Sequence, residues 1–203
     1  MATPRRTRPS PGRPEATTRA EIERVAFDLF AEHGFDGTTL DMIATGVGVG
    51  RRTLFRYFTS KNDIPWGDFG ASLDSFATIL AATPADVPLW RAVHHGVRAF
   101  NDFDADVMPL HRQRMALILA TPTLQAHSVL QYAAWRGVIA EFVADRRGLA
   151  PGDLLPRTVG HLSLALAISA YEQWLRDDGD LVDLVDRAMT ALREHLGDEG
   201  GPH

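Results

Sequence analysis

The sequence predicts an all-α protein, with a three-helix head, a larger helical body and about nine helices in total. Three observations lead to this fold class. Apolar residues recur at helical spacing, as in Ile22, Val25, Ala26, Leu29 and Phe30. Capping residues and glycine or proline stops separate the helical segments. No segment alternates apolar and polar residues as a strand would, so neither a sheet nor a strand-linked phosphate loop is expected.

The composition is that of a globular chain of one or two domains. Its 203 residues can bury a sizeable core, and 45% of them are apolar. No apolar run reaches the ~18 residues of a membrane span, and no apolar stretch follows the first arginines as in a signal peptide. Cysteine is absent, which excludes disulfides and thiolate metal sites. We therefore expect a cytoplasmic protein with no membrane partner.

Charge is unevenly distributed along the chain. Residues 1–61 carry 10 basic and 7 acidic side chains, whereas residues 62–203 carry 11 basic and 19 acidic ones. A basic head followed by an acidic body predicts that a nucleic-acid surface is confined to one end of the chain.

The first 16 residues contain four prolines and four arginines. Such a segment cannot bury enough apolar area to fold, so we expect it to be disordered. Two interpretations stay open. It is either a solvated tail or an arm whose arginines (Arg5, Arg6, Arg8, Arg13) contact phosphates or the minor groove of DNA.

The first helix is expected from about Arg19 to His33. Thr18 and Glu21 have the spacing of a capping box, which satisfies free backbone N–H groups at a helix start. Gly34 followed by apolar Phe35 predicts a stop of the Schellman type. This helix would pack behind the next two and complete the head.

Residues 38–61 have the pattern of a helix-turn-helix. We expect its first helix from about Thr39 to Gly46, capped by the hydroxyl of Thr38. Gly48 would form the turn, because a tight turn needs the positive φ that glycine adopts at no steric cost. Val49 would anchor that turn in the core.

The second helix of the pair is expected from Arg51 to Tyr57 and would read DNA. It buries Leu54 and Phe58, which leaves a basic outer face. Two adjacent arginines at the start of a recognition helix can donate bidentate hydrogen bonds to O6 and N7 of guanine. The predicted DNA-binding residues are Thr38, Thr39, Gly50, Arg51, Arg52, Thr53, Phe55, Arg56, Tyr57 and Lys61.

An amphipathic hairpin with a solvated basic face is the alternative to a DNA reader. The turn, the spacing and the basic face agree with one another, and this agreement favours the DNA reader. Lys61 adds to it, because a cation beside the free N–H groups of the following helix start would hold a phosphate.

This stretch resembles the TetR family of bacterial transcriptional regulators, whose pattern runs T-T-x-x-x-I-A-x-x-A-G-V-S-x-x-T-L-Y-x-Y-F-x-x-K. Gly50 replaces the usual capping Ser, Val47 replaces Ala, and Phe55 replaces Tyr and lacks its hydroxyl. The resemblance implies a repressor that binds a near-palindromic operator as a dimer and is released by a small effector. The matching residues are Thr38, Thr39, Ile43, Ala44, Gly48, Val49, Thr53, Leu54, Tyr57, Phe58 and Lys61.

The rest of the chain predicts six more helices. Ser60 and Asp63 form a second capping box, and the helix that they open is expected to bend at Pro65 and Gly67. The expected bounds are Ser60 to Leu80, Asp86 to Phe100, an end near Ala120, Thr121 to Arg147, Arg157 to Arg176, and Asp180 to Leu196.

The last two helices are candidates for a subunit interface. The helix at 157–176 is apolar nearly all round and must be covered on several sides. It could close the core of its own subunit, or it could pack with residues 180–196 against a second copy. The family resemblance implies the second arrangement, because TetR-like regulators dimerise through a four-helix bundle of their last two helices.

A ligand pocket is expected between the helices of the body, a common place for one in a bundle. Large apolar side chains would form its walls and arginines would guide an anionic group. Each aromatic could instead be plain core, and each arginine a surface ion pair. The predicted ligand-binding residues are Phe76, Trp90, Arg98, Phe100, Arg112, Met115, Leu119, Trp135, Arg136 and Phe142, with Arg114 as a further guide.

Neither a metal ion nor a cofactor is expected. Adjacent His94 and His95 would point to different faces of a helix, so they make a poor ligand pair. We expect His94, His111 and His127 to line a cavity or to make core hydrogen bonds. An enzyme is not expected, because no carboxylate pair or nucleophile–base pair has a convincing spacing.

Two runs extend the resemblance to the TetR regulators found with mycofactocin biosynthesis genes. They are GRRTLFRYFTSKNDIPWGDF and ALILATPTLQAHSVLQYAAWRGVIAEFVADR, and the unusual part is Asn62 to Gly67. This resemblance implies a repressor released by long-chain acyl-coenzyme A (acyl-CoA).

The sequence therefore predicts a ligand-responsive, homodimeric regulator that binds double-stranded DNA. Two alternatives stay open: a constitutive DNA-binding protein without an effector, and an enzyme built on a helical bundle. The expected parts are a disordered basic arm (1–16), a helix-turn-helix domain (17–61), a ligand-binding and dimerisation domain (62–197) and a tail (198–203).

Overall fold

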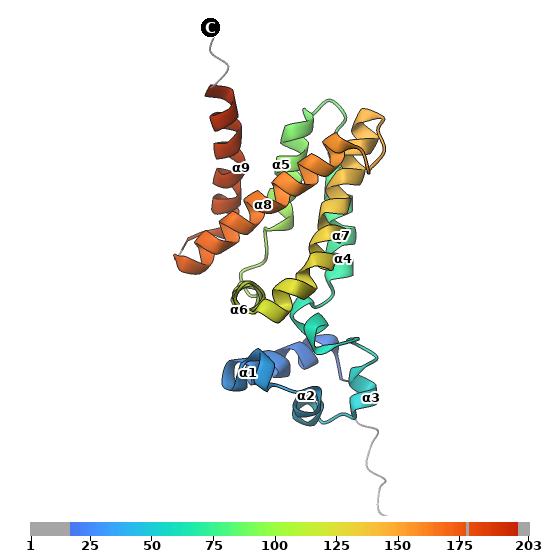
Figure 1. Ribbon diagram of the computed structural model, residues 1–203, viewed down its shortest axis with the longest axis vertical. Coiled ribbons are helices and arrows are strands. Elements are labelled where there is room, and N and C mark those ends of the chain that lie inside the picture. Colours follow the sequence, from blue (N-terminus) through green and yellow to red (C-terminus); the bar gives the residue numbers. More distant parts are fainter. Residues whose placement is uncertain (1–16, 178, 199–203) are drawn as a thin grey trace, which may run out of the picture. The chain divides into compact units, whose positions relative to one another are not determined.

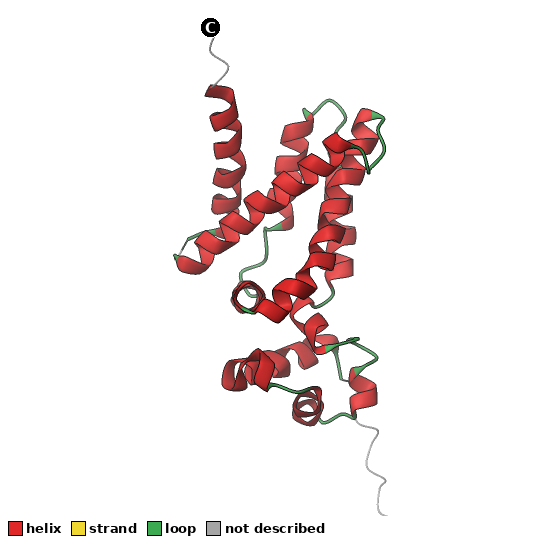
Figure 2. Cartoon of the chain, viewed as in Figure 1, coloured by secondary structure: helices red, strands yellow, loops and turns green. Residues whose placement is uncertain are grey.

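The computed structural model describes residues 17–177 and 179–198 (Figure 1). The proposed arm at 1–16 and residues 199–203 of the expected tail lie outside this part. Every regular element of the described residues is a helix and none is a strand (Figure 2), which confirms the all-α class. The chain forms two compact units, and the boundary lies between Thr59 and Ser60.

In the first unit, residues 17–59 form three helices around a small core. The four side chains Ile22, Ala26, Ile43 and Leu54 are fully buried, and they come from all three helices. Each helix therefore contributes to one shared core, which holds together segments too short to be stable alone. The bounds are α1 (Arg19–Gly37), α2 (Leu40–Val47) and α3 (Arg51–Leu54).

Both ends of α1 follow the expected chemistry, with differences in detail. The Thr18 hydroxyl accepts the backbone N–H of Glu21 at 3.1 Å. The Glu21 carboxylate does not reach back to Thr18 as a full capping box requires; it accepts the hydroxyl of Thr17 at 2.8 Å. Gly34 has φ of 72° and kinks the chain where the stop was expected, and Phe35 after it is buried.

The predicted cap of α2 was wrong by one residue. Thr39, not Thr38, caps the helix, because its hydroxyl accepts the N–H of Met42 at 3.2 Å. Thr38 is instead buried, with its hydroxyl 2.8 Å from the carbonyl oxygen of Gly34. Its role is to satisfy the end of α1. Gly48, with φ of 74°, forms the turn after α2 as expected.

The recognition helix is shorter than expected. Regular α-helix ends at Leu54, and the chain continues to Tyr57 in tighter turns, in which the Tyr57 N–H donates to Leu54 O at 3.0 Å. Gly50 precedes α3 and offers no side chain to cap it. Leu54 and Phe58 are buried as predicted, so burial against the head, more than helix propensity, holds this segment.

The described residues of the second unit form a short 3₁₀ helix and six α-helices. In Figure 1, α7 lies beside α4 and α8, and α9 lies beside α8 and α5. None of the described helices is long and apolar enough to cross a membrane. The bounds are η1 (Lys61–Trp66), α4 (Phe69–Ala81), α5 (Leu89–Phe100), α6 (Met108–Ala120), α7 (Pro122–Arg147), α8 (Leu154–Arg176) and α9 (Leu181–Asp198).

The expected bent helix at residues 60–80 is in fact two separate elements. The capping box is present, since the Ser60 N–H donates to Asp63 Oδ2 at 2.7 Å. The helix that it opens is the 3₁₀ element η1, and Gly67 ends it with φ of 57° and ψ of −137°. The Asp68 carboxylate then caps α4. A proline within the turns and a glycine outside the helical region break the chain here.

Two glycines let helices of the body approach closely. A Cβ at Gly160 on α8 would lie 2.8 Å from the backbone oxygen of Arg136 on α7. A Cβ at Gly96 on α5 would lie 2.3 Å from Leu80 Cδ2 on α4. Both distances are shorter than real Cβ contacts, so these two helix pairs depend on the missing side chain.

Two predicted helix starts were also displaced. The fifth helix begins at Leu89, after Pro88, and not at Asp86. The eighth begins at Leu154, three residues before the expected start, whereas the ninth begins at Leu181, within one residue of the expected start. The expected proline at the start of α7 is present as Pro122.

Candidate functional site

The first candidate site is the outer surface of α3. Arg51, Arg52, Phe55 and Arg56 are exposed, while Leu54 faces the core. The side chains of Arg52 and Arg56 make no hydrogen bond or ion pair with any described residue. Both side chains are therefore available to phosphates or base edges of DNA.

Arg51 is held differently from Arg52. Its guanidinium donates to Asp41 Oδ2 at 3.4 Å and lies 5.6 Å from the centre of the Phe55 ring. Both partners of the ion pair are more than half exposed, so the pair is screened by water and adds little stability. Asp41 therefore restrains Arg51 without neutralising the basic face.

One predicted DNA contact needs correction. Thr38 is 1% exposed, and its hydroxyl is used within the head, so its side chain does not reach the surface. Tyr57 is half-buried, and its hydroxyl donates to Thr17 O at 2.6 Å, which fastens the end of the recognition segment to the residue before the cap of α1. DNA contact by Tyr57 stays a prediction.

The remaining predicted DNA contacts have different surroundings. Thr39 and Gly50 are exposed, and Thr53 is half-buried. Lys61 is half-buried on η1, in the second unit. For these residues DNA contact stays a prediction.

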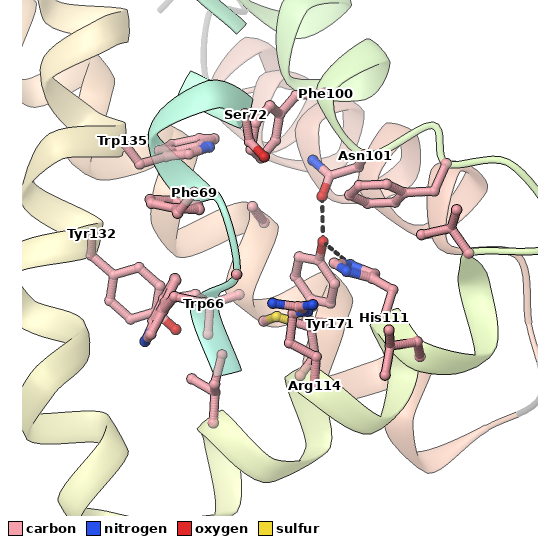
Figure 3. A pocket seen from close by; sticks show the side chains of 18 of the residues that line it. Trp66, Phe69, Ser72, Phe100, Asn101, His111, Arg114, Tyr132, Trp135 and Tyr171 are labelled. Atoms are coloured by element: carbon pink, nitrogen blue, oxygen red, sulfur yellow. Dashed lines mark hydrogen bonds between the residues drawn. The ribbon is translucent and has the colours of Figure 1, made fainter. Parts of the chain in front are cut away.

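The second candidate site is a cavity of about 290 Å³ within the second unit. Figure 3 shows its walls, to which η1, the start of α4, the end of α5, α6, α7 and α8 all contribute. Its lining is mostly apolar and strongly aromatic. Its lining includes Trp66, Phe69, Phe100, Asn101, His111, Arg114, Met115, Tyr132, Trp135, Ala167 and Tyr171.

A chain of hydrogen bonds runs along one wall (Figure 3). The Tyr171 hydroxyl donates to Asn101 Oδ1 at 2.7 Å, and His111 Nε2 lies 2.8 Å from the same hydroxyl. Burial, together with the nearby Arg114 cation, lowers the pKa of His111 to about 4. Burial also raises the pKa of Tyr171. Both groups are therefore neutral at pH 7, which suits an apolar cavity.

Arg114 provides the cation of the cavity wall. Its Nη1 donates to the carbonyl oxygen of Pro65 at 2.6 Å, which ties α6 to η1. A guanidinium keeps its charge when buried and presents several donors in one plane. The cavity can therefore accept an apolar body with an anionic or carbonyl group beside Arg114.

Trp66 and Tyr132 close another side of the cavity, with their rings 5.6 Å apart. The indole N–H of Trp66 is buried and has no hydrogen-bond partner among the described residues. The hydroxyl of Tyr132 is also buried, and burial raises the pKa of Tyr132 while a hydrogen bond with Ser128 opposes that shift. A ligand acceptor placed beside the indole N–H could receive a hydrogen bond from it.

Some of the predicted ligand residues line the cavity or lie directly behind its wall. Phe100, Met115 and Trp135 line the cavity, and so does Arg114. Phe76 is fully buried behind the wall, with its ring 5.2 Å from that of Trp135.

The other predicted ligand residues lie elsewhere, which corrects that part of the prediction. Arg98 is exposed on α5, and Arg112 lies over the Trp174 ring. Trp90 is 43% exposed and lies between Arg91 and Arg193. Leu119, Arg136 and Phe142 also do not line the cavity.

Sequence reasoning missed most of the wall that η1 forms, and it missed the partners of His111. Trp66 lies between Pro65 and Gly67, and this break could have indicated an exposed turn available to a cavity. Tyr171 and Asn101 gave no comparable indication, because a single polar residue on an apolar helix has many possible partners.

The three histidines singled out from the sequence make internal hydrogen bonds, as predicted. His94 Nε2 lies 2.9 Å from Asp186 Oδ1, and His127 Nε2 lies 2.8 Å from Asp63 Oδ1. Within residues 17–177 and 179–198, no group of three His, Asp or Glu side chains is placed to hold a metal ion.

Two family models match the chain, one over each unit. Residues 22–64 match the family described as bacterial regulatory proteins, tetR family. Residues 87–197 match the MftR C-terminal domain. The first match covers the helix-turn-helix, and the second covers most of the unit that contains the cavity.

Two relatives are similar over most of their length. The chain is 48% identical over 191 residues to a Mycobacterium tuberculosis protein named as the mycofactocin biosynthesis transcriptional regulator MftR, which covers 90% of this chain and 96% of the relative. It is 31% identical over 191 residues to the HTH-type transcriptional regulator TcmR of Streptomyces glaucescens, covering 88% and 84%.

Solved structures show the same fold. The fatty acid degradation regulator FadR of Bacillus halodurans has a TM-score of 0.63 at 17% identity, covering 92% of this chain and all of that one. FadR of Thermus thermophilus, solved with lauroyl-CoA, has a TM-score of 0.58 at 22% identity, covering 87% and 94%. With its helix-turn-helix head and matching body, the chain belongs to the TetR family of transcriptional regulators, in the group that carries an MftR C-terminal domain.

Proposed function

We propose that this regulator represses its target genes by binding a near-palindromic operator as a homodimer, and that an acyl-CoA releases it. Regulators of the TetR family bind DNA as dimers and respond to small molecules. What this chain adds is an apolar cavity with Arg114 in its wall. That cavity is the observation that carries the choice of effector. The proposal places the protein in the cytoplasm, where its operator is.

The cavity suits the chain of a fatty acyl group. Its walls include Phe69, Phe100, Met115 and Trp135, and burial of each methylene against such walls is worth about 0.8 kcal/mol. The phosphates of coenzyme A would have to stay outside, because a buried charge without partners is very costly. The lauroyl-CoA bound to the Thermus thermophilus FadR is consistent with this division of the ligand.

Release of DNA requires the effector to change the segment that leads to the head. Trp66, Gly67 and Phe69 line the cavity and belong to η1 and the start of α4, the first elements after the boundary at Thr59. A ligand that packs better against another arrangement of these residues shifts the protein toward that arrangement. Couplings of this kind are typically about 1–3 kcal/mol.

The proposed dimer interface is formed by α8 and α9. Leu162 on α8 is 45% exposed. It lies with Leu166, Met189 and Leu192 in an open groove that α8 and α9 line together with the start of α5 and the end of α7. Exposed apolar side chains gathered in a groove are typical of a surface that a partner covers. A second copy of the chain is the occupant that two-fold operator binding requires.

The test uses genomic DNA fragments recovered on the purified protein. Operator affinity is measured by fluorescence anisotropy with dodecanoyl-CoA, hexadecanoyl-CoA or free coenzyme A. We expect the acyl-CoAs to weaken operator binding at least tenfold and free coenzyme A to have no effect. Ala167→Phe, which fills the cavity, should keep operator binding and lose the response. Ala133→Phe, at an exposed position on α7, should keep both. Unchanged operator affinity with every acyl-CoA would refute the proposed effector.

A constitutive DNA-binding protein is the second candidate. It would bind the same fragments and ignore all compounds. The cavity argues against this candidate. An unfilled void of this size loses van der Waals contacts that would otherwise stabilise the folded protein, and a bound ligand would restore them.

A further inference from the structure

The hydrogen bonds along the cavity wall have only one possible direction. The Asn101 side chain donates through Nδ2 to the carbonyl oxygen of Val97 at 2.7 Å, and a carbonyl can only accept. Asn101 Oδ1 therefore faces Tyr171, whose hydroxyl donates its single proton to it. The Tyr171 oxygen is left as an acceptor, so His111 Nε2, 2.8 Å away, must carry a proton and donate it.

This direction determines the tautomer of His111. The ring is neutral at pH 7, because burial and the Arg114 charge lower the pKa of His111 to about 4. A neutral imidazole has one N–H, and here Nε2 holds it, so Nδ1 is a bare acceptor. Nδ1 makes no hydrogen bond with any described residue. The ring is part of the cavity wall.

No donor among the described residues is bonded to Nδ1 of His111. Its ring packs on Phe103, with centres 4.0 Å apart, and lies 6.1 Å from the Trp174 ring. Arg114, the nearby cation, donates to Pro65 O at 2.6 Å. An acceptor in an apolar site loses its bonds to water and gains only if a donor replaces them.

We propose that the cavity selects effectors that carry a hydrogen-bond donor, an O–H or an amide N–H, and that Nδ1 of His111 receives it. This inference rests on the proposed ligand function of the cavity and specifies the chemistry of its occupant. The donor can come from a hydroxyl on an acyl chain or from an amide of the pantetheine arm. His111 is then a specificity-determining residue, and Tyr171 and Asn101 are positioning residues that fix its tautomer.

The test compares matched pairs of probes that are small enough to adopt different positions within the cavity. 1-Octanol donates and heptyl methyl ether only accepts, although the two have the same formula. N-hexylacetamide and hexyl acetate, matched in heavy-atom number, form the amide arm. Affinities are measured by calorimetry on the full-length dimer. We expect the donor of at least one pair to bind about threefold to tenfold more tightly than its partner, the range for one neutral hydrogen bond. The pair that shows the preference identifies the source of the donor.

Two variants test whether His111 and Tyr171 cause the preference for hydrogen-bond donors. His111→Phe keeps an aromatic ring and should bring the ratio within a pair to about one. The control His161→Phe, at an exposed position on α8, should leave it unchanged. Tyr171→Phe frees the His111 tautomer, so the ratio should also fall while probes still bind. Nitrogen chemical shifts should show the Nε2–H tautomer in the wild type and a mixture in Tyr171→Phe.

The outcomes separate this inference from the proposed function. If both members of each pair bind equally well, or if the ratios survive His111→Phe, donor selection is wrong while the cavity remains a ligand site. A wild-type ring protonated at Nδ1 would also overturn it. If no probe and no acyl-CoA binds, the proposed ligand function itself fails and the inference fails with it.

Discussion

Nε2 of His127 on α7 lies 2.8 Å from Oδ1 of Asp63 on η1, and the other oxygen of the same carboxylate accepts both the N–H and the hydroxyl of Ser60. One carboxylate thus holds the first residue of the second unit and joins it to α7. Both side chains of the pair are less than a third exposed. The start of η1 is therefore fastened to the body and not left as a free linker.

We expect His127→Phe to lower the free energy of unfolding by about 1–2 kcal/mol, because a partly buried carboxylate loses a charge-assisted partner. Urea unfolding at pH 7 measures this change. His95→Phe, at an exposed position on α5, serves as the control and should change stability by less than about 0.5 kcal/mol. Equal effects of the two substitutions would mean that the pair contributes nothing.

Two glycines on neighbouring helices should respond in opposite ways to alanine. A methyl group at Gly160 would meet the backbone oxygen of Arg136 at 2.8 Å, and backbone cannot move aside cheaply. Gly160→Ala should therefore cost about 2 kcal/mol or more. Gly137 on α7 has nothing within 4 Å of the same position, so Gly137→Ala should gain about 0.5–1 kcal/mol from helix propensity. Thermal and urea unfolding of both variants would check the signs, and destabilisation by both would contradict this reading of the α7–α8 contact.

His111 should make stability depend on pH. Its pKa is lowered from 6.5 to about 4 in the folded protein, so the unfolded chain binds a proton first as pH falls. The contribution of His111 is therefore complete above about pH 6.5 and is lost progressively as pH falls toward 4. Its size is at most about 3 kcal/mol. Unfolding free energies of wild type and His111→Gln should converge between pH 7 and pH 4, and a constant difference would show that the ring is not protected from protonation.

Substitution of Arg52 should change the sequence specificity of DNA binding, whereas substitution of Lys61 should change its overall affinity and salt dependence. Arg52 is exposed at the start of α3, where base contacts are made. Arg52→Ala should cost about 1–3 kcal/mol and relax specificity at one base pair. Lys61→Ala should weaken all sequences alike and reduce the salt dependence by about one unit of slope. Anisotropy titrations with operator and scrambled DNA at several salt concentrations distinguish these results. A loss from Arg52→Ala that is equal on both DNAs would remove its role in base reading.

The proposed interface predicts a contrast between two exposed leucines. Leu162 lies in the groove lined by α5, α7, α8 and α9, whereas Leu130 on α7 is 74% exposed and lies outside it. Leu162→Arg should turn the dimer into a monomer and abolish tight operator binding, because a buried unpaired charge at an interface is costly. Leu130→Arg should leave the dimer intact. Sedimentation equilibrium reports the mass, and a dimeric Leu162→Arg protein would exclude this part of α8 from the interface.

Local sequence chemistry was a good guide to where helices begin and end. Gly48 and Gly34 adopt positive φ at the two predicted stops, and Pro122 begins α7. One or two local residues determine where these helices begin or end, so the sequence alone is enough to predict such positions. The error at Thr38 and Thr39 shows the limit of this approach. Two adjacent threonines can both cap, and the choice depends on the carbonyl groups at the end of α1.

The walls of the cavity were less predictable, because they depend on which face each helix turns toward its neighbours. Phe100 and Trp135 line the cavity, but Trp90, one helix turn from buried residues of α5, is largely outside. The arginines illustrate the same difficulty. Arg114 reaches the cavity, whereas Arg98 reaches solvent, since a long charged side chain can follow either path from a similar helical position.

From the shortness of α3 we expect operator recognition to be partly a folding reaction. Only Arg51–Leu54 are regular α-helix, and no side chain caps their start. Leu54 and Phe58 hold this segment to the head, but one helical turn has few backbone hydrogen bonds of its own. We therefore expect the segment to open locally and its exposed amide hydrogens to exchange with solvent ahead of those of α1. DNA that fits the segment would halt this opening and would bind with favourable enthalpy set against lost chain entropy. A near-match operator would then be rejected twice, through the missing base contact and through a recognition helix that it fails to stabilise.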